Sequence, residues 1–155
     1  MDKRLRNSGI DIIGDIPWGT HIGQLYSSKE DFFQTGVTYI QSGLINNELC
    51  IWIYSDNTTY EEIKDKLSEY MDDIDFYLQL GQLKIMHYSQ WYVKGNCFNE
   101  VRVNERWNNF IKYGLQNGYD GLRAIAYTAW LEKSCYKSFF DYERNVENII
   151  SELPF

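Results

Sequence analysis

A histidine and several aromatic side chains stand at the end of a predicted strand. Residues 87–92 (HYSQWY) close the apolar segment 83–88 and include Tyr88, Trp91 and Tyr92. Indole and phenol rings can enclose an apolar guest or stack on a cation. This run therefore predicts one wall of a pocket for a small molecule. The alternative for His87 is a histidine whose hydrogen bonds are satisfied near a strand end.

A second group of such side chains precedes the first predicted strand. The chain places these side chains close together: Asp15 precedes Pro17, and Trp18 and His21 follow it. Proline fixes its own backbone and restricts the residue before it, so this segment is expected to be rigid and extended. One interpretation is that this segment forms one edge of a binding site. The other is that it is structural and closes the strand edge, with Trp18 covering the core and Asp15 capping a turn.

Arg123 lies inside an apolar strand, and Trp130 and Glu132 follow that strand. A buried guanidinium without a partner costs several kcal/mol, so Arg123 is expected to pair with a carboxylate. We expect that partner to be Asp120, Glu132 or Glu143. The pair is then structural, or else Arg123 holds an anionic ligand.

The residues offer little for metal or catalytic chemistry. His21 and His87 are the only histidines, and with Asp15 or Cys97 they make a weak metal signal. No nucleophile elbow and no Cys–His pairing at an informative spacing occurs. Adjacent acids such as Glu61–Glu62 fit exposed helix surfaces. We therefore expect no metal, no cofactor and no catalytic residue, and a protein that is not an enzyme.

The glycine loop 19–23 (GTHIG) raises a second hypothesis, nucleotide binding. A phosphate-binding loop has Gly-x-x-x-x-Gly-Lys-Ser/Thr before a helix, with the lysine on the outer phosphates. Here the glycine spacing is one residue short, and Gln24–Leu25 stand in place of Lys-Ser/Thr. A turn that uses glycine for backbone freedom is the simpler interpretation.

Strand and helix patterns alternate along the chain, which indicates βαβ units. We expect strands at 21–26, 49–54, 83–88 and 121–128, and helices from Ser27–Ser28 to Asn46 and at 60–71, 75–80, 99–116 and 137–153. This predicts a three-layer α/β/α sandwich with a mostly parallel, doubly wound sheet, like a P-loop NTPase without its Walker A motif. Ligands of such sheets bind beyond the carboxyl ends of the strands.

Composition limits the function classes. The 155 residues predict a single domain over 1–155, with 1–8 expected to be disordered. A net charge of −7 disfavours direct binding to nucleic acid or to an anionic membrane. Three scattered cysteines, no signal peptide and no long apolar run favour a cytoplasmic protein.

Several segments together resemble one family, the MEDS domain (methanogen/methylotroph, DcmR sensory domain). The matching segments are 15–22 (DIPWGTHI), 24–26 (QLY), 43–44 (GL), 48–53 (ELCIWI), 81–83 (GQL), 91–92 (WY), 119–123 (YDGLR), 130–133 (WLEK) and 140–143 (FDYE). The resemblance implies a sensory input module for methylated or halogenated hydrocarbon derivatives, joined to a histidine kinase of a two-component system or to a transcription regulator. It also implies a degenerate relative of RecA/KaiC-like ATPase domains. The family usually continues into a further apolar strand, whose absence would leave a sheet edge open for aggregation or for a partner.

We therefore expect a small-molecule-sensing domain, and a homodimer is one assembly that it could form. The alternatives are a RecA/KaiC-like nucleotide-binding domain or a protein-interaction module without a ligand. Segment 89–98 is expected to move on binding. The expected ligand-binding residues are Asp15, Trp18, His21, Tyr88, Trp91, Tyr92, Arg123, Trp130 and Glu132.

Overall fold

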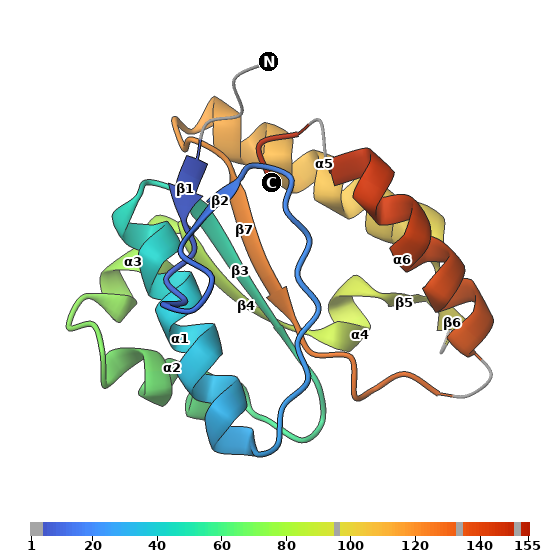
Figure 1. The fold of residues 1–155 in the computed structure, drawn as a ribbon, viewed down its shortest axis with the longest axis horizontal. Helices are drawn as coiled ribbons and strands as arrows, with labels where there is room; N and C mark the ends of the chain where they lie inside the picture. Colours follow the sequence, from blue (N-terminus) through green and yellow to red (C-terminus); the bar gives the residue numbers. More distant parts are fainter. Residues whose placement is uncertain (1–4, 95–96, 133–134, 151–152) are drawn as a thin grey trace.

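A three-stranded parallel sheet organises the protein. The computed structural model describes residues 5–94, 97–132, 135–150 and 153–155. The strand order is β4 (Leu83–His87), β3 (Leu49–Tyr54) and β7 (Leu122–Ala126), and both pairings are parallel (Figure 1). The first five residues of β3 are buried because helices cover both faces of this central strand, as its unbroken apolar run predicts.

Three helices pack on one face of the sheet, namely α1 (Lys29–Ile45), α2 (Tyr60–Ser68) and α3 (Ile74–Leu80). They share an apolar core with Cys50 and Trp52 of β3. The stripe expected on α1 is confirmed, since Phe33, Val37 and Ile40 are all buried, as is Leu44. This face is therefore closed by a helix whose inward side could be read from its 3.6-residue period.

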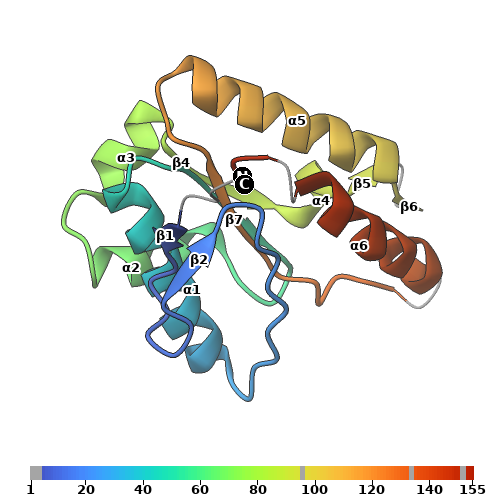
Figure 2. The same ribbon diagram turned by 45° about the horizontal axis from the view of Figure 1, so that its top comes forward.

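Two further helices, α5 (Glu100–Gln116) and α6 (Tyr136–Ile150), pack on the opposite face (Figure 2). Val103 and Trp107 point inward as expected. Leu115, also expected inward, is 49% exposed, and Ile111 is buried instead. Near Leu115 the buried residue is Gly114, where an added Cβ atom would stand in van der Waals contact with Leu49 at 3.4 Å.

The helix ends follow the capping signals of the sequence. Ser28 caps α1 by accepting a hydrogen bond from the Asp31 N–H at 3.1 Å. Thr59 and Glu62 form a reciprocal capping box at the start of α2. Gly81 ends α3 with φ of +77°, a conformation that glycine adopts without steric cost.

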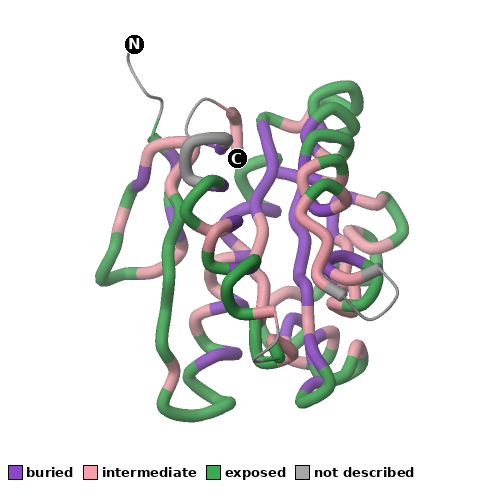
Figure 3. Tube along the Cα trace, turned by 90° about the vertical axis from the view of Figure 1, so that its right-hand side faces the viewer, coloured by how far each residue is buried: buried purple, intermediate pink, exposed green. Residues whose placement is uncertain are grey.

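Two segments beside the sheet differ from the expectation. Residues 21–26 form no strand; they run as an exposed, extended connection beside the sheet (Figure 3). The reason is that a strand needs a hydrogen-bonded neighbour, and a cleft separates this connection from β7. Segment 89–98, expected to be a loop, contains the turn α4 (Tyr88–Trp91) and the short strands β5 (Val93–Lys94) and β6 (Cys97–Phe98).

The amino terminus carries an antiparallel pair, β1 (Leu5–Asn7) and β2 (Asp15–Pro17). Residues 5–8 were expected to be disordered, yet Arg6 and Ser8 are buried. Arg6 is held by an ion pair with Glu48 at 2.8 Å. Within the described ranges, no helix is both long and apolar enough to cross a membrane.

Candidate functional site

Polar side chains from two neighbouring strands meet beyond the carboxyl ends of the sheet. Asp56 follows β3, and His87 ends β4 directly opposite Tyr54. The His87 Nε2 atom lies 3.0 Å from Asp56 Oδ1, and its Nδ1 atom lies 2.7 Å from Ser89 Oγ. The Tyr88 hydroxyl donates to Asp56 Oδ2 at 3.3 Å. Parallel pairing places these groups together because both strands end at the same edge.

An aromatic stack adjoins this polar group. The Trp130 ring stacks with both Tyr88 and Tyr92, at centroid distances of 5.2 Å and interplanar angles of 7° and 24° respectively. Phe98 and Phe139 surround it at 6.5 and 5.8 Å. We call Asp56, His87, Tyr88, Ser89, Tyr92 and Trp130 the carboxyl-edge cluster.

The indole N–H of Trp130 is buried and has no hydrogen-bond acceptor among the described residues. An unsatisfied buried donor costs about 1–3 kcal/mol. The cluster therefore contains one donor that an acceptor atom of a guest could satisfy.

The tyrosines of the cluster stay protonated at neutral pH. Burial raises the pKa of Tyr92 well above its ordinary value. Burial also raises the pKa of Tyr88, and the nearby carboxylates of Asp56 and Glu132 raise it further. Both residues thus act as neutral rings with hydroxyl groups.

A cleft of about 850 Å³ adjoins this cluster at Tyr92 and runs along β7. Its walls come from segment 20–26, from β7 and the residues after it, and from α6. Tyr39, Trp107 and Phe139 make its lining largely apolar. At its side His21 Nε2 lies 3.3 Å from Glu143 Oε2, and burial raises the pKa of Glu143.

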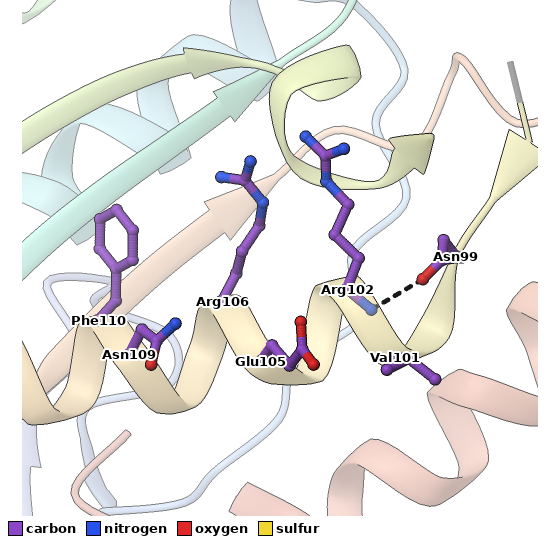
Figure 4. A pocket seen from close by; sticks show the side chains of 7 residues that line it. All are labelled: Asn99, Val101, Arg102, Glu105, Arg106, Asn109 and Phe110. Atoms are coloured by element: carbon purple, nitrogen blue, oxygen red, sulfur yellow. Dashed lines mark hydrogen bonds between the residues drawn. The ribbon is translucent and has the colours of Figure 1, made fainter. Parts of the chain in front are cut away.

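A second hollow, of about 630 Å³, lies on α5, and two arginine side chains line it (Figure 4). Arg102 donates to the Gln90 carbonyl oxygen at 3.2 Å, and the Arg106 guanidinium lies 5.6 Å from the Trp91 ring centroid. These contacts join α5 to α4, so the arginines have a structural explanation.

The structure brings together part of the expected site. Tyr88, Tyr92 and Trp130 form the stack described above, and Glu132 lies exposed beside it. His21 lines the neighbouring cleft. Tyr88, Tyr92, Trp130 and Glu132 thus lie at or near the carboxyl edge, whereas His21 follows Trp18 and Gly19 closely in the chain.

Trp91 does not join the stack. Its side chain is fully buried against Trp107 and Phe110, at centroid distances of 4.4 and 5.0 Å. Adjacent residues on a helical turn point about 100° apart. Trp91 therefore faces α5 while Tyr92 faces Trp130.

Arg123 pairs with Glu48, which corrects the expected partners Asp120, Glu132 and Glu143. Its Nε and Nη2 atoms donate to the two Glu48 carboxylate oxygens at 2.7 and 2.8 Å. The remaining donors reach the backbone oxygens of Asn7, Ser8 and Tyr39. All five guanidinium N–H groups are thus used inside the protein, as in a structural ion pair.

Asp15 and Trp18 lie at the opposite, amino edge of the sheet. Asp15 Oδ1 accepts from the Asn7 side chain at 3.1 Å. The Trp18 ring lies under the Arg6 guanidinium at 4.4 Å and against Gly121, which precedes β7. The three tryptophans proposed as walls of one pocket, Trp18, Trp91 and Trp130, therefore occupy three separate places.

The expected ligand-binding residues did not include Asp56 or His87, although His87 belongs to the run 87–92 that predicts a pocket wall. Both residues follow or end a predicted strand, and that position is the sequence signal for them. Glu48, at the opposite edge, has no such local signal. Among the described residues, no group of three or more His, Cys, Asp or Glu side chains could hold a metal ion.

Comparison with known proteins gives one result. No curated protein and no solved structure matches the chain. The family model described as MEDS, the MEthanogen/methylotroph, DcmR Sensory domain, matches residues 20–155. The chain belongs to this family of sensory domains.

Proposed function

We propose that this protein is a cytoplasmic input domain that senses a small, largely apolar molecule at the carboxyl-edge cluster. Membership of a sensory-domain family supports an input role. The observation that carries the choice of site is the buried, unsatisfied indole N–H of Trp130 together with the stacking of its ring on Tyr88 and on Tyr92 at the carboxyl edge. The doubly wound, three-layer arrangement of P-loop proteins belongs to the same proposal, since its ligands bind at this edge.

The cluster selects a guest with an apolar body and one acceptor atom. The rings offer apolar faces, and the Trp130 N–H offers a directional donor. Methylated or halogenated hydrocarbon derivatives fit this description. Asp56 and His87 lie at the open side of the cluster and can bind a polar end of the guest.

Binding can be transmitted through α4. The stacked rings already lie 5.2 Å apart, so a guest that enters between them must separate Tyr88 from Trp130. Tyr88 begins α4, and the Tyr92 carbonyl oxygen accepts from Asn99 N–H at the start of α5 at 3.0 Å. A ligand that favours the separated state therefore shifts α4 and, through the Tyr92–Asn99 hydrogen bond, the start of α5. The proposed receiver is a histidine kinase or a transcription regulator, and the sensor acts as a monomer or a homodimer.

Tryptophan fluorescence tests the proposal with a panel of methylated amines, methyl thiols and chlorinated methanes. At least one compound is expected to cause a saturable change in emission and a higher melting temperature. Trp130→Phe is expected to abolish both effects. Trp18→Phe, at the other edge of the sheet, is the matched control and is expected to keep them. The absence of any response across the panel, or an unchanged response in Trp130→Phe, would reject the site.

The nucleotide-binding alternative is not favoured. The Gly19 N–H donates to the Phe155 carbonyl oxygen at 2.8 Å, and α1 begins at Lys29, several residues after Gly23. The glycine loop therefore does not present its amides at a helix start, as a phosphate cradle must.

A further inference from the structure

Two arginine side chains of α5 enter the same hollow. Figure 4 shows the guanidinium groups of Arg102 and Arg106 on one side of the helix, both directed toward the turn α4. Residues four positions apart lie on one face of a helix, so the two positive charges are close together. Burial lowers the pKa of Arg106, and the charge of Arg102 lowers this pKa further. The hollow therefore concentrates positive charge in a chain whose net charge is −7.

Most guanidinium N–H groups in this hollow have no acceptor among the described residues. Arg102 donates from Nη2 to the Gln90 oxygen, but its Nε is buried and unsatisfied. Arg106 lies over the Trp91 ring, and no hydrogen bond joins its side chain to the described chain. These contacts hold the arginines against α4 and leave most of their donors unused. A buried donor without an acceptor costs about 1–3 kcal/mol, so an acceptor from outside would be favoured.

The two arginines also lack a neutralising carboxylate within the described part of the chain. The buried Arg123 is paired at two points with Glu48, whereas no ion pair joins Arg102 or Arg106 to a described acid. Glu105 lines the same hollow, but its side chain is exposed and pairs with neither arginine. The counter-charge that a structural arginine normally has is therefore missing at this place.

The rest of the lining suits an anion that carries an apolar group. Asn99 accepts from the Arg102 backbone N–H through Oδ1 at 2.8 Å, which leaves its amide nitrogen as a donor. Phe110 adds an aromatic ring on the same side of α5 as the guanidinium groups (Figure 4). Lys84 Nζ lies 6.0 Å from the centroid of that ring and brings a third positive charge from β4.

We propose that this hollow binds a small phosphate monoester, with its phosphate between Arg102 and Arg106 and its organic part against Phe110. A planar guanidinium group binds phosphate oxygens in pairs. Two such groups match a phosphate monoester, which carries a charge of about −1.5 to −2 at pH 7, whereas a carboxylate carries one charge. The hollow shares no lining residue with the carboxyl-edge cluster, so either proposal can fail without the other.

NMR titration of the arginine Nε–H signals at constant ionic strength tests the site. The probes are phenyl phosphate and inorganic phosphate, and benzoate is the control with the same ring and a single charge. Both phosphates are expected to cause saturable shifts of the Arg102 and Arg106 signals, with tighter binding of phenyl phosphate. Benzoate is expected to bind at least about tenfold more weakly than phenyl phosphate.

Arg106→Gln is expected to weaken binding of phenyl phosphate at least about tenfold, equal to about 1.4 kcal/mol. Arg144→Gln is the matched control, because it removes the same charge from an exposed position on α6, and it is expected to bind like the parent. Glu105→Gln is expected to bind at least as tightly as the parent, since a carboxylate in the hollow repels the ligand. Should Arg106→Gln fail to fold, Arg106→Lys keeps the charge, removes the paired donors and is also expected to weaken binding.

An end-blocked tripeptide with a central phosphoserine identifies the source of the phosphate group. Binding of this peptide at least about tenfold tighter than phenyl phosphate would assign the hollow to a phosphorylated polypeptide and overturn the small ligand. The proposal is also overturned if neither phosphate causes a saturable shift, or if benzoate binds as tightly as phenyl phosphate. Equal weakening in Arg106→Gln and Arg144→Gln would overturn it as well, because the effect would then be one of overall charge.

Discussion

Glu48 and Arg123 form a two-point ion pair inside the protein, although they lie 75 positions apart in the chain. Glu48 precedes β3 and Arg123 lies on β7, so the pair ties neighbouring strands together at the amino edge of the sheet. Arg6 adds a third partner from β1. The group joins the terminal hairpin to the sheet through charge-assisted hydrogen bonds.

Replacing Glu48 by Gln is therefore expected to lower the free energy of unfolding by about 3–5 kcal/mol, because two buried guanidinium groups lose their counter-charge. Urea denaturation measures the change. The matched control is Glu69→Gln, which removes an exposed carboxylate paired with Lys66 and is expected to cost less than about 1 kcal/mol. Equal losses in both variants would contradict a structural role for the buried group.

Gly36→Ala is expected to destabilise the protein by about 1–3 kcal/mol through overpacking. A Cβ atom there would stand 2.5 Å from the Trp52 ring, between α1 and β3. Gly23→Ala is the control, since its Cβ would meet no atom within 4 Å. Thermal melting of the two variants separates a steric effect from a general cost of replacing glycine.

Tyr142→Phe is expected to cost about 1–3 kcal/mol, because it leaves the buried Trp107 N–H without its acceptor. That N–H donates to the Tyr142 hydroxyl at 2.8 Å and joins α5 to α6. Val146→Ala, on the same face of α6, is a control that removes apolar contact but no hydrogen bond. A change in Trp107 emission in Tyr142→Phe alone would identify the lost bond, and unchanged stability and emission would contradict it.

Stability is expected to fall as the pH rises above about 10. Burial raises the pKa values of Tyr92 and Tyr142 above the ordinary 10.0. The unfolded chain therefore releases these protons first, and ionisation favours unfolding. The contribution is complete below pH 10 and is lost as the pH approaches the folded-state pKa values. Urea denaturation from pH 8 to 11 measures the slope, which Tyr92→Phe should reduce and the exposed Tyr70→Phe should not.

Tyr88→Ala is expected to open the aromatic stack and expose one face of Trp130, which shifts its emission to longer wavelength. The loss of one stacked pair costs roughly 0.5–1.5 kcal/mol beyond the buried area. Tyr77→Ala, whose ring packs with Phe76 on α3, removes a comparable ring far from Trp130 and is expected to leave that emission unchanged. An identical spectrum in Tyr88→Ala would show that the ring does not shield Trp130.

Local signals determined much of the architecture. The stripe of Phe33, Val37 and Ile40, the Thr59–Glu62 capping box and the apolar run of β3 each act within a few residues, so the sequence predicts them correctly. The family resemblance is also a property of the sequence alone and is confirmed over residues 20–155. The position of ligand-binding edges follows from the strand–helix order once the sheet is parallel.

Tertiary structure alone decided which side chains meet. Trp91 and Tyr92 are neighbours in the chain, but a helical turn directs them to different aromatic partners within one core. Arg123 bonds to Glu48 because the pairing of β3 with β7 brings the two side chains together. No local pattern in the sequence reveals the register of that pairing. Residues 21–26 have the composition of a strand, yet they remain unpaired because strand formation depends on a neighbour's backbone groups and not on the segment itself.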